Sequence, residues 1–222
     1  MHVEWHGQSA FTLSGDGARV FIDPFADMSP MADRGIQFDY PAIEVDGVDL
    51  LLITHEHLDH NGVETIAGDP VILRSTAGRL ESPIGEVVAI ASEHDTSAGT
   101  ERGPNTVFVF TLDGVRTAHF GDFGQVELRP EQRAAIGEVD MVILPVGGGP
   151  TIGAEQAAKI VDELAPRWVV PMHYRTARIG FLETEEEFLN LMARVQRLDS
   201  AEFDTASLTQ DDGPLTVVPA AP

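Results

Sequence analysis

The sequence predicts a layered domain of mixed strands and helices, of the α/β or α+β class, over residues 1–222. Three observations predict it. Short apolar runs, several of them ending at Asp, His or Pro, dominate the first two thirds of the chain. Segments with apolar side chains at helical spacing lie between the later runs. At 222 residues, 43% of them hydrophobic, the chain is long enough to bury a substantial core.

The expected strands are the short apolar runs. Apolar side chains in unbroken succession are typical of strands that are buried on both faces. The Asp113-Gly114 pair, a hairpin turn signal, separates two of them. The runs cover residues 20–22, 50–53, 71–73, 87–90, 106–110, 115–120, 141–144, 168–170 and 215–218.

Two helices are expected in the last third of the chain. Residues 151–164 have helical periodicity, and Pro166 follows their end. A capping box of Thr184 and Glu187 is expected to start the second helix. Its core-facing stripe comprises Phe188, Leu191, Met192 and Val195. Residues 200–222 are expected to form a loop and the final strand.

Composition limits the partners of the chain. It has 36 acidic and 14 basic residues, a formal charge of −22, and no cysteine. Such an acidic surface disfavours binding to nucleic acids and to anionic membranes. No apolar run approaches the roughly 18 residues that a membrane span needs, and no signal peptide is recognisable at residues 1–6. We therefore expect a cytoplasmic protein without disulfides, thiolate ligands or a cysteine nucleophile.

The sharpest chemical signal is residues 55–60 (HEHLDH), which follow an expected strand. A buried strand can hold such a loop rigidly while the loop exposes its side chains. On extended backbone His55 and His57 point the same way, and a helix beginning near Asn61 would aim Asp59 and His60 at a second position. Imidazoles and carboxylates suit zinc, iron, manganese or nickel.

The helical metalloprotease pattern H-E-x-x-H is the competing short motif. It does not fit, because Asp59 stands four residues after His55 where that pattern needs a histidine. The segment instead resembles the H-x-H-x-D-H signature of the metallo-β-lactamase superfamily. Further motifs of that superfamily follow in order. They are an early strand ending at Asp23, an isolated histidine at His94, a strand ending at Asp122 and a strand ending at His173.

The resemblance covers nearly the whole chain. It is closest to small metal-dependent hydrolases of bacteria and archaea that are related to the ascorbate-phosphate lactonases, of which residues 144–157 look typical. It implies an α+β fold, the four-layer αββα sandwich, with the site along one edge of the two packed sheets. It also implies two divalent metal ions, with zinc as the first expectation and manganese, nickel or iron as alternatives.

The resemblance also implies the role of each ligand. One ion would take His55, His57 and His94, the other Asp59, His60 and His173, and Asp122 would bridge them. A hydroxide shared by the two ions would be the nucleophile, and the ions would stabilise the developing oxyanion. Asp59 is the expected catalytic residue, because it would hold one ion and orient the hydroxide.

Four other residues are candidates near the site. Asp23 is expected to orient the ligand loop by hydrogen bonding, with a strand-end cap as the alternative. Relatives often carry Gly-His-Ser where this chain has Gln8, and His6 stands two residues earlier. His6 either lines the site or is a hydrogen-bonded strand histidine, and we favour the latter. His119 is expected to support the ligands or to pack, and Tyr174 either to donate a proton to the leaving group or to pack.

The expected function is hydrolysis of a small ester, lactone, amide or phosphodiester. One alternative is a phosphodiesterase or nuclease of the same superfamily, which the short interval between Asp122 and His173 and the acidic charge disfavour. Another is an iron oxygenase, which bound iron and oxygen uptake would distinguish. A non-catalytic metal-binding protein is disfavoured by the complete ligand set. The expected partner is a small-molecule substrate, and the sequence leaves open whether the chain forms a homo-oligomer.

Overall fold

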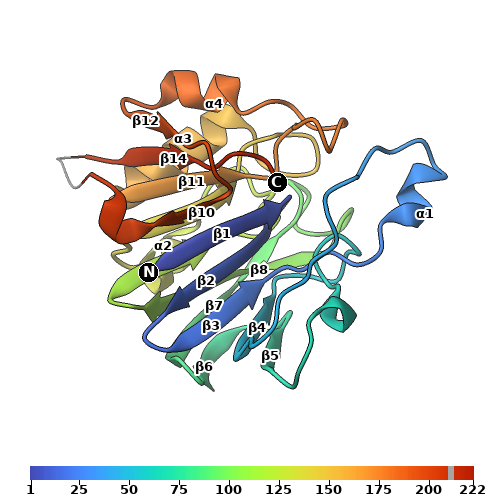
Figure 1. The fold of residues 1–222 in the computed structure, drawn as a ribbon. Helices are drawn as coiled ribbons and strands as arrows, with labels where there is room; N and C mark the ends of the chain where they lie inside the picture. Colours follow the sequence, from blue (N-terminus) through green and yellow to red (C-terminus); the bar gives the residue numbers. More distant parts are fainter. Residues whose placement is uncertain (210–212) are drawn as a thin grey trace.

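The computed structural model describes residues 1–209 and 213–222 and contains two facing β-sheets (Figure 1). The first sheet has the order β13 (Glu202–Asp204), β1 (His2–Gly7), β2 (Ala10–Gly15), β3 (Ala18–Ile22), β4 (Leu50–Ile53), β5 (Val71–Arg74). The second has the order β12 (Val195–Arg197), β14 (Leu215–Val218), β11 (Trp168–Met172), β10 (Met141–Pro145), β9 (Val115–His119), β8 (Pro104–Leu112), β7 (Gly85–Glu93), β6 (Gly78–Ser82). Both sheets mix parallel and antiparallel pairs.

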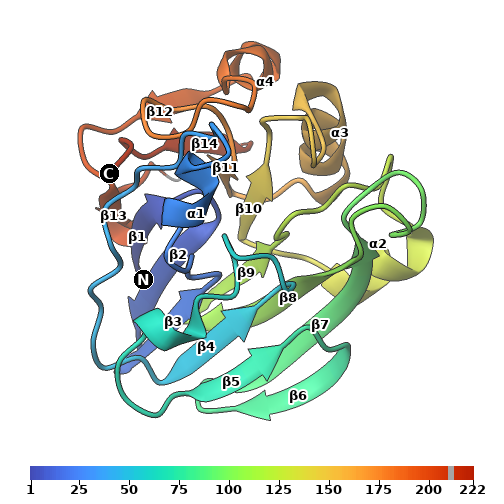
Figure 2. The same cartoon turned by 90° about the vertical axis from the view of Figure 1, so that its right-hand side faces the viewer.

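Helices pack against the second sheet. α2 (Pro130–Ile136) lies against β7, α3 (Ala154–Leu164) lies against β10, and α4 (Glu186–Leu191) packs on α3. The short α1 (Ser29–Ala32) extends instead from the edge of the sandwich, on the viewer's side of the sheets in Figure 2. Two 3₁₀ turns, η1 (Val63–Thr65) and η2 (Thr205–Ser207), complete the elements. Among the described residues, no helix has the length and hydrophobicity needed to cross a bilayer.

The centre of the first sheet, at β3 and β4, is buried on both faces. Alternate residues of β3 and β4, such as Ile22 and Leu52, face the main core between the sheets. Their neighbours, such as Phe21 and Leu51, pack under the segment of residues 25–48 on the outer face. That segment is mostly irregular chain, so the layer outside the first sheet consists of α1, η1 and loops rather than long helices.

A strand is present at each of the nine apolar runs expected from the sequence. The last run, residues 215–218, forms β14. β1 and β2 were not recognised, although β1 alternates strictly between buried and half-buried residues and so has the period of a strand. β6, β12 and β13 are not predicted either. All three are edge strands with few apolar side chains, and β12 and β13 are only three residues long. The final segment therefore contributes β13 to the first sheet as well as β14 to the second.

The second expected helix is shorter than its periodicity indicates. α4 has Glu185 at its N-cap without a side-chain capping bond, so the capping box expected at Thr184 does not form. The Arg197 guanidinium instead donates to the carboxylates of Glu185 and Glu186, at 2.8 and 2.7 Å. The helix ends at Leu191, and Val195 begins β12, which pairs in parallel with β14. Both Leu191 and Val195 are exposed and do not face the core.

Candidate metal centre

Strands from both sheets end at one shared edge of the sandwich. β3 and β4 are parallel neighbours in the first sheet, and β9, β10 and β11 are parallel in the second. β7 runs in the direction of β9, because β8 is antiparallel to both. Within three residues after the ends of β3, β4, β7, β9 and β11 stand Asp23, His55, His94, Asp122 and His173. This edge is on the right of Figure 1, where α1 extends.

Seven side chains meet at this edge as potential ligands. Within each of three overlapping groups, the nitrogen and oxygen donor atoms lie within 4.8 Å of one another. The groups are His55, His57, His94; His55, His60, Asp122; and Asp59, His60, His173. Asp122 Oδ2 lies 3.1 Å from His94 Nε2 and 3.3 Å from His173 Nε2, and Asp122 Oδ1 lies 3.2 Å from His60 Nε2. The Asp122 carboxylate is therefore shared by imidazoles from both halves of the cluster.

The loop of residues 55–60 continues into turns, not into the expected helix. The backbone N–H groups of His60 and Asn61 both donate to the carbonyl of His57, at 2.9 and 3.0 Å. Gly62 then donates to Pro24 O at 2.7 Å, and a Cβ at Gly62 would lie 2.5 Å from the backbone after β3. This close packing against the first sheet stops a helix, and the turn itself brings His60 to the second position.

Asp23 hydrogen-bonds both the loop of residues 55–60 and the end of β4. Its buried carboxylate accepts hydrogen bonds from Thr54 N at 2.8 Å and from Thr54 Oγ1 at 2.7 Å. It accepts a third from His60 Nδ1 at 2.9 Å. His60 Nδ1 donates this bond, so Nε2 is the atom that His60 directs into the cluster, where it can hold either a proton or a metal ion. That Nε2 is buried and has no hydrogen-bond partner among the described residues.

Other ligands are oriented in the same way. The Thr54 hydroxyl donates to Asp23, so its oxygen accepts from His55 Nδ1 at 3.1 Å. His94 Nδ1 donates to the carbonyl oxygen of Pro150 at 3.0 Å. Both imidazoles therefore direct an unprotonated Nε2 inward, which is the form that binds a metal ion. The residues present thus fit one or two divalent cations held by nitrogen and oxygen donors.

The charges around the cluster also favour a cation. Burial alone would raise the pKa of the Asp122 carboxyl, but the imidazoles of His173 and His60 hold it well below its usual range. Burial disfavours a charged His60, yet nearby carboxylates, with Asp122 foremost, raise its pKa well above 6.5. Burial and the neighbouring His60 lower the pKa of His55. Buried carboxylates that stabilise positive charge at this point would stabilise a divalent ion in the same place.

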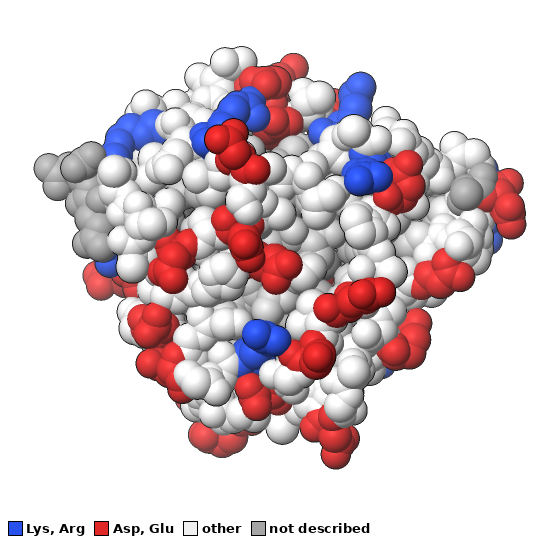
Figure 3. All heavy atoms as spheres, in the orientation of Figure 1, with Lys and Arg blue, Asp and Glu red and all other residues white. Residues whose placement is uncertain are grey.

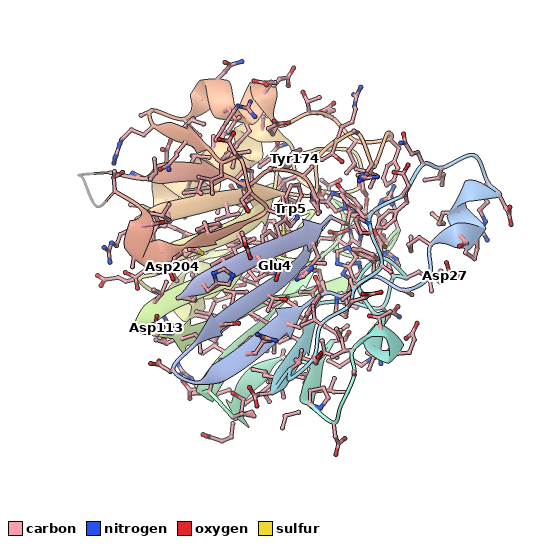
Figure 4. All side chains as sticks on the ribbon, in the orientation of Figure 1. Glu4, Trp5, Asp27, Asp113, Tyr174 and Asp204 are labelled. Carbon is pink, nitrogen blue, oxygen red and sulfur yellow. The ribbon has the colours of Figure 1, made fainter. Side chains whose placement is uncertain are left out.

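Two candidates from the sequence are not at the site. His6 lies on the outer face of β1, where its Nε2 is 2.7 Å from Thr12 Oγ1 and its ring stacks on Phe21. It is therefore the hydrogen-bonded strand histidine that was favoured. Tyr174 is buried beside Trp5, with ring centroids 5.4 Å apart (Figure 4). Burial and Glu185 raise its pKa, so the Tyr174 hydroxyl is not a suitable proton donor for the site.

His119 lies directly behind the cluster. Its Nε2 donates to the carbonyl of Ser9 at 3.1 Å, and its Nδ1 accepts from Gly121 N at 3.2 Å. Ser9 Oγ in turn lies 3.5 Å from Asp122 Oδ1. His119 thus bonds two chain segments that flank Asp122 without contacting the cluster itself.

Two residues that were not predicted as site residues also shape the site. Gln8 Nε2 donates to Asp59 Oδ2 at 3.2 Å, and Asn105 Oδ1 accepts from Asp122 N at 3.0 Å. The substitution of Gln8 for histidine in the Gly-His-Ser pattern was the available signal for the first. Asn105 lies on a strand among apolar residues, so only its burial reveals its role. A cavity of about 420 Å³ opens over five members of the cluster, which are His57, Asp59, His94, Asp122 and His173.

Comparison with known proteins agrees with this architecture. A family model described as "Beta-lactamase superfamily domain" matches residues 2–173. A proposed Zn-dependent hydrolase of the metallo-β-lactamase superfamily from Thermotoga maritima has a similar structure. Its TM-score is 0.77, with 27% identity over 98% of this chain and 97% of that chain. Two facing sheets with a donor cluster at their shared edge therefore define a protein of the metallo-β-lactamase fold, as expected.

Proteins with similar sequences identify the family within this superfamily. A UPF0173 metal-dependent hydrolase of Pyrococcus furiosus is 34% identical over 200 residues, which is 78% of this chain and 84% of that protein. Another from Thermococcus onnurineus is 33% identical with the same coverage. The chain belongs to the UPF0173 metal-dependent hydrolases of the metallo-β-lactamase superfamily. The narrower relation to the ascorbate-phosphate lactonases stays a prediction.

Proposed function

We propose that this protein hydrolyses a small ester, lactone, amide or phosphodiester with two divalent metal ions, zinc by preference. The observation that supports this most is the inward direction of the Nε2 atoms of His55, His60 and His94 around the shared carboxylate of Asp122. The metal-dependent relatives and the Zn-dependent description of the Thermotoga maritima protein support the same conclusion.

The ligand set divides into two sites around Asp122. His55, His57 and His94 would hold one ion, Asp59, His60 and His173 would hold the other, and Asp122 would contact both. When bound, two such ions lower the pKa of a shared water molecule, so that a hydroxide nucleophile exists near neutral pH.

The residues of this chain supply orientation and proton transfer. Asp59 lines the cavity, and its side chain is 22% exposed, so it can face a substrate. Gln8 holds Asp59 Oδ2, which leaves Oδ1 free to accept a proton from the nucleophile and to return it to the leaving group. Because Tyr174 is buried away from the cavity, Asp59 is the proposed source of that proton.

The surface favours small substrates over polynucleotides. Figure 3 shows acidic side chains spread over the face that it presents, with few basic side chains among them. This charge distribution repels a phosphate backbone, while a small substrate needs only the local charge of the metal site. Lactones, including sugar-phosphate lactones of the kind that the ascorbate-phosphate lactonases open, therefore belong among the first substrates to test.

Metal analysis and a substrate panel test the proposal together. Protein purified without chelators should contain about two first-row metal ions per chain and should hydrolyse members of a panel of lactones, esters, amides and phosphodiesters. Chelation should abolish turnover and added zinc should restore it. Asp122→Asn should retain the fold but lose metal and most turnover. Bound iron with oxygen uptake and no hydrolysis, or full activity in Asp122→Asn, would contradict the proposal.

A further inference from the structure

We propose that the substrate carries an apolar segment and, remote from the scissile bond, an anionic group that Arg102 binds. This inference rests on the proposed function, because it concerns the cavity over the same metal centre. The cavity of about 420 Å³ combines the donor cluster, an apolar wall and Arg102, and each part selects a different portion of a ligand.

The apolar wall comes from two sides of the donor cluster. Met28, Met31 and Ile36 reach the cavity from the segment around α1, and Leu58 and Phe181 line it from loops beside the ligands. Leu58 and Phe181 are 51% and 50% exposed, and exposed apolar side chains that border one cavity are typical of a ligand-binding groove. A ligand with an apolar segment would cover both, and flexible methionines can adapt to its shape.

Arg102 is the only arginine or lysine among the described residues that line this cavity. Some surface arginines are paired with carboxylates, as Arg74 is with Glu56 and Arg129 with Glu93. Arg34, which lies outside the cavity lining, has no ion pair within the described part of the chain. The Arg102 guanidinium has no ion pair or hydrogen bond with any residue in 1–209 or 213–222. The cavity carboxylates Asp59 and Asp122 are directed into the donor cluster. The chain has 36 acidic residues, yet none of those described pairs with the Arg102 guanidinium. An anionic group on the ligand could form that ion pair.

The position of Arg102 relative to the metal centre is fixed by the loop that follows His94. The carboxylate of Asp95 accepts four backbone hydrogen bonds, at 2.8–3.0 Å, from Ser97, Gly99, Glu101 and Arg102. The backbone of His94 also donates to Gly103 O at 3.1 Å. His94 and Arg102 therefore extend from the same anchored loop. The separation between the metal centre and the guanidinium can then select substrates by the distance between their scissile bond and their anionic group.

Binding of unreactive acids tests this inference without any turnover. Zinc-loaded protein is titrated calorimetrically with glutarate, adipate and pimelate and with the matched monoacids pentanoate, hexanoate and heptanoate. One carboxylate should bind the metal centre and the second should reach Arg102. At least one diacid should therefore bind about tenfold more tightly than its monoacid, as one charge-assisted contact allows. Replacing the distal carboxylate by a phosphonate shows whether the site prefers carboxylate or phosphate chemistry.

Two variants isolate the guanidinium. Arg102→Gln should remove the diacid advantage and leave monoacid binding unchanged. Arg34→Gln, which removes the same charge from an exposed arginine outside the cavity lining, should keep the advantage. Thermal melts establish that both variants fold. Equal binding of diacids and monoacids by the unaltered protein, or an unchanged advantage in Arg102→Gln, would overturn the inference.

Hydrolysis separates this inference from the proposed function. The monoester of adipate with 4-nitrophenol is compared with 4-nitrophenyl hexanoate, and Arg102→Gln should raise the KM of the anionic ester alone by about tenfold. A diacid preference without hydrolysis of any panel substrate would contradict the proposed function and keep the anion site. Hydrolysis with no preference for the anionic ester or the diacids would overturn the anion site and keep the proposed function.

Discussion

At the scale of single residues, Asp23 shows how one buried carboxylate determines the form of its neighbours. Its three hydrogen bonds fix the Thr54 hydroxyl and the His60 ring, and Thr54 in turn fixes His55. Ligands of both proposed ions thus depend on a residue that would touch neither ion. Partners of this kind commonly change metal affinity when they are altered.

Asp23→Asn should weaken metal binding by about 10- to 100-fold. An amide keeps the shape, but its NH₂ group would face the donors Thr54 Oγ1 and His60 Nδ1 in place of an acceptor. Zinc affinity is measured by competition with a chromophoric chelator. Asp69→Asn, at an exposed aspartate, is the matched control and should bind zinc like the unaltered protein. Equal affinity in the two variants would show that Asp23 only caps the strand.

Gln8 should act on turnover more than on metal content. It stands at a positive φ of 51° and holds Asp59 Oδ2, the proposed proton carrier. Gln8→Ala should keep both ions and lower kcat about tenfold, while Gln8→His should retain most activity because an imidazole can also donate to Asp59. Ala and His experience the same backbone strain at this φ, so their difference isolates the side chain. Steady-state kinetics with metal analysis checks this, and equal kcat in both variants would contradict it.

At the scale of elements, the sequence predicts strand ends well and connections poorly. The runs that end at Asp23, His55 and His173 are apolar on both faces, and a strand between two packed layers needs that composition. The resemblance to the superfamily then placed the ligands at those ends. The turn after His60 was not predictable, because Gly62 packs against Pro24, a contact that depends on the two strands being neighbours.

The segment over the outer face of the first sheet was also beyond prediction. Residues 25–48 have no helical or strand periodicity, yet Phe25, Phe38 and Tyr40 stack together there, with ring centroids 5.2–6.1 Å apart. Such irregular cover is specified by tertiary packing on β3 and β4, not by local propensity. One side of the apolar wall of the cavity, formed by Met28, Met31 and Ile36, belongs to this segment, so substrate specificity is the least predictable part of the site.

Gly147→Ala should disturb the connection after β10. A Cβ at Gly147 would lie 2.2 Å from His173 O and 2.7 Å from Tyr174 Cα, so one of the two backbones must move. Overpacking of this kind costs about 1–3 kcal/mol, and displacement of His173 should weaken the second metal site. Urea denaturation and metal stoichiometry measure both effects. Gly153→Ala, where the nearest atom would be 3.6 Å away, should cost less than about 1 kcal/mol; similar losses in the two variants would contradict the packing argument.

At the scale of the whole molecule, charge and metal chemistry are separated in space. The acidic residues that make up the charge of −22 lie largely on the surface, whereas Asp23 and Asp122 are buried among imidazoles. The surface carboxylates therefore repel one another, and the buried carboxylates would neutralise a bound cation. A local positive centre under an acidic surface requires its anionic substrate to be small, which agrees with a single guanidinium in the cavity.

The same molecule should lose stability in mild acid, partly through histidines outside the metal centre. Burial lowers the pKa of His6 and of His119 to about 4, from the usual 6.5. Their contribution is complete above pH 6.5, because neither state is then protonated. Between pH 6.5 and 4 the unfolded chain binds the proton first, so stability falls as the pH drops, and below about 4 the loss levels off.

His6 offers the cleanest measurement of this effect, because it lies on the outer face of β1, away from the ligands. In metal-free protein, the free energy of unfolding should fall from pH 7 to pH 4.5 by about 2 kcal/mol more in the unaltered chain than in His6→Gln. Glutamine stays neutral and can still bond to Thr12, so the difference reports the proton alone. Urea titrations at the two pH values provide the comparison. Parallel losses in the two proteins would mean that the His6 imidazole accepts a proton as readily in the folded sheet as in the unfolded chain.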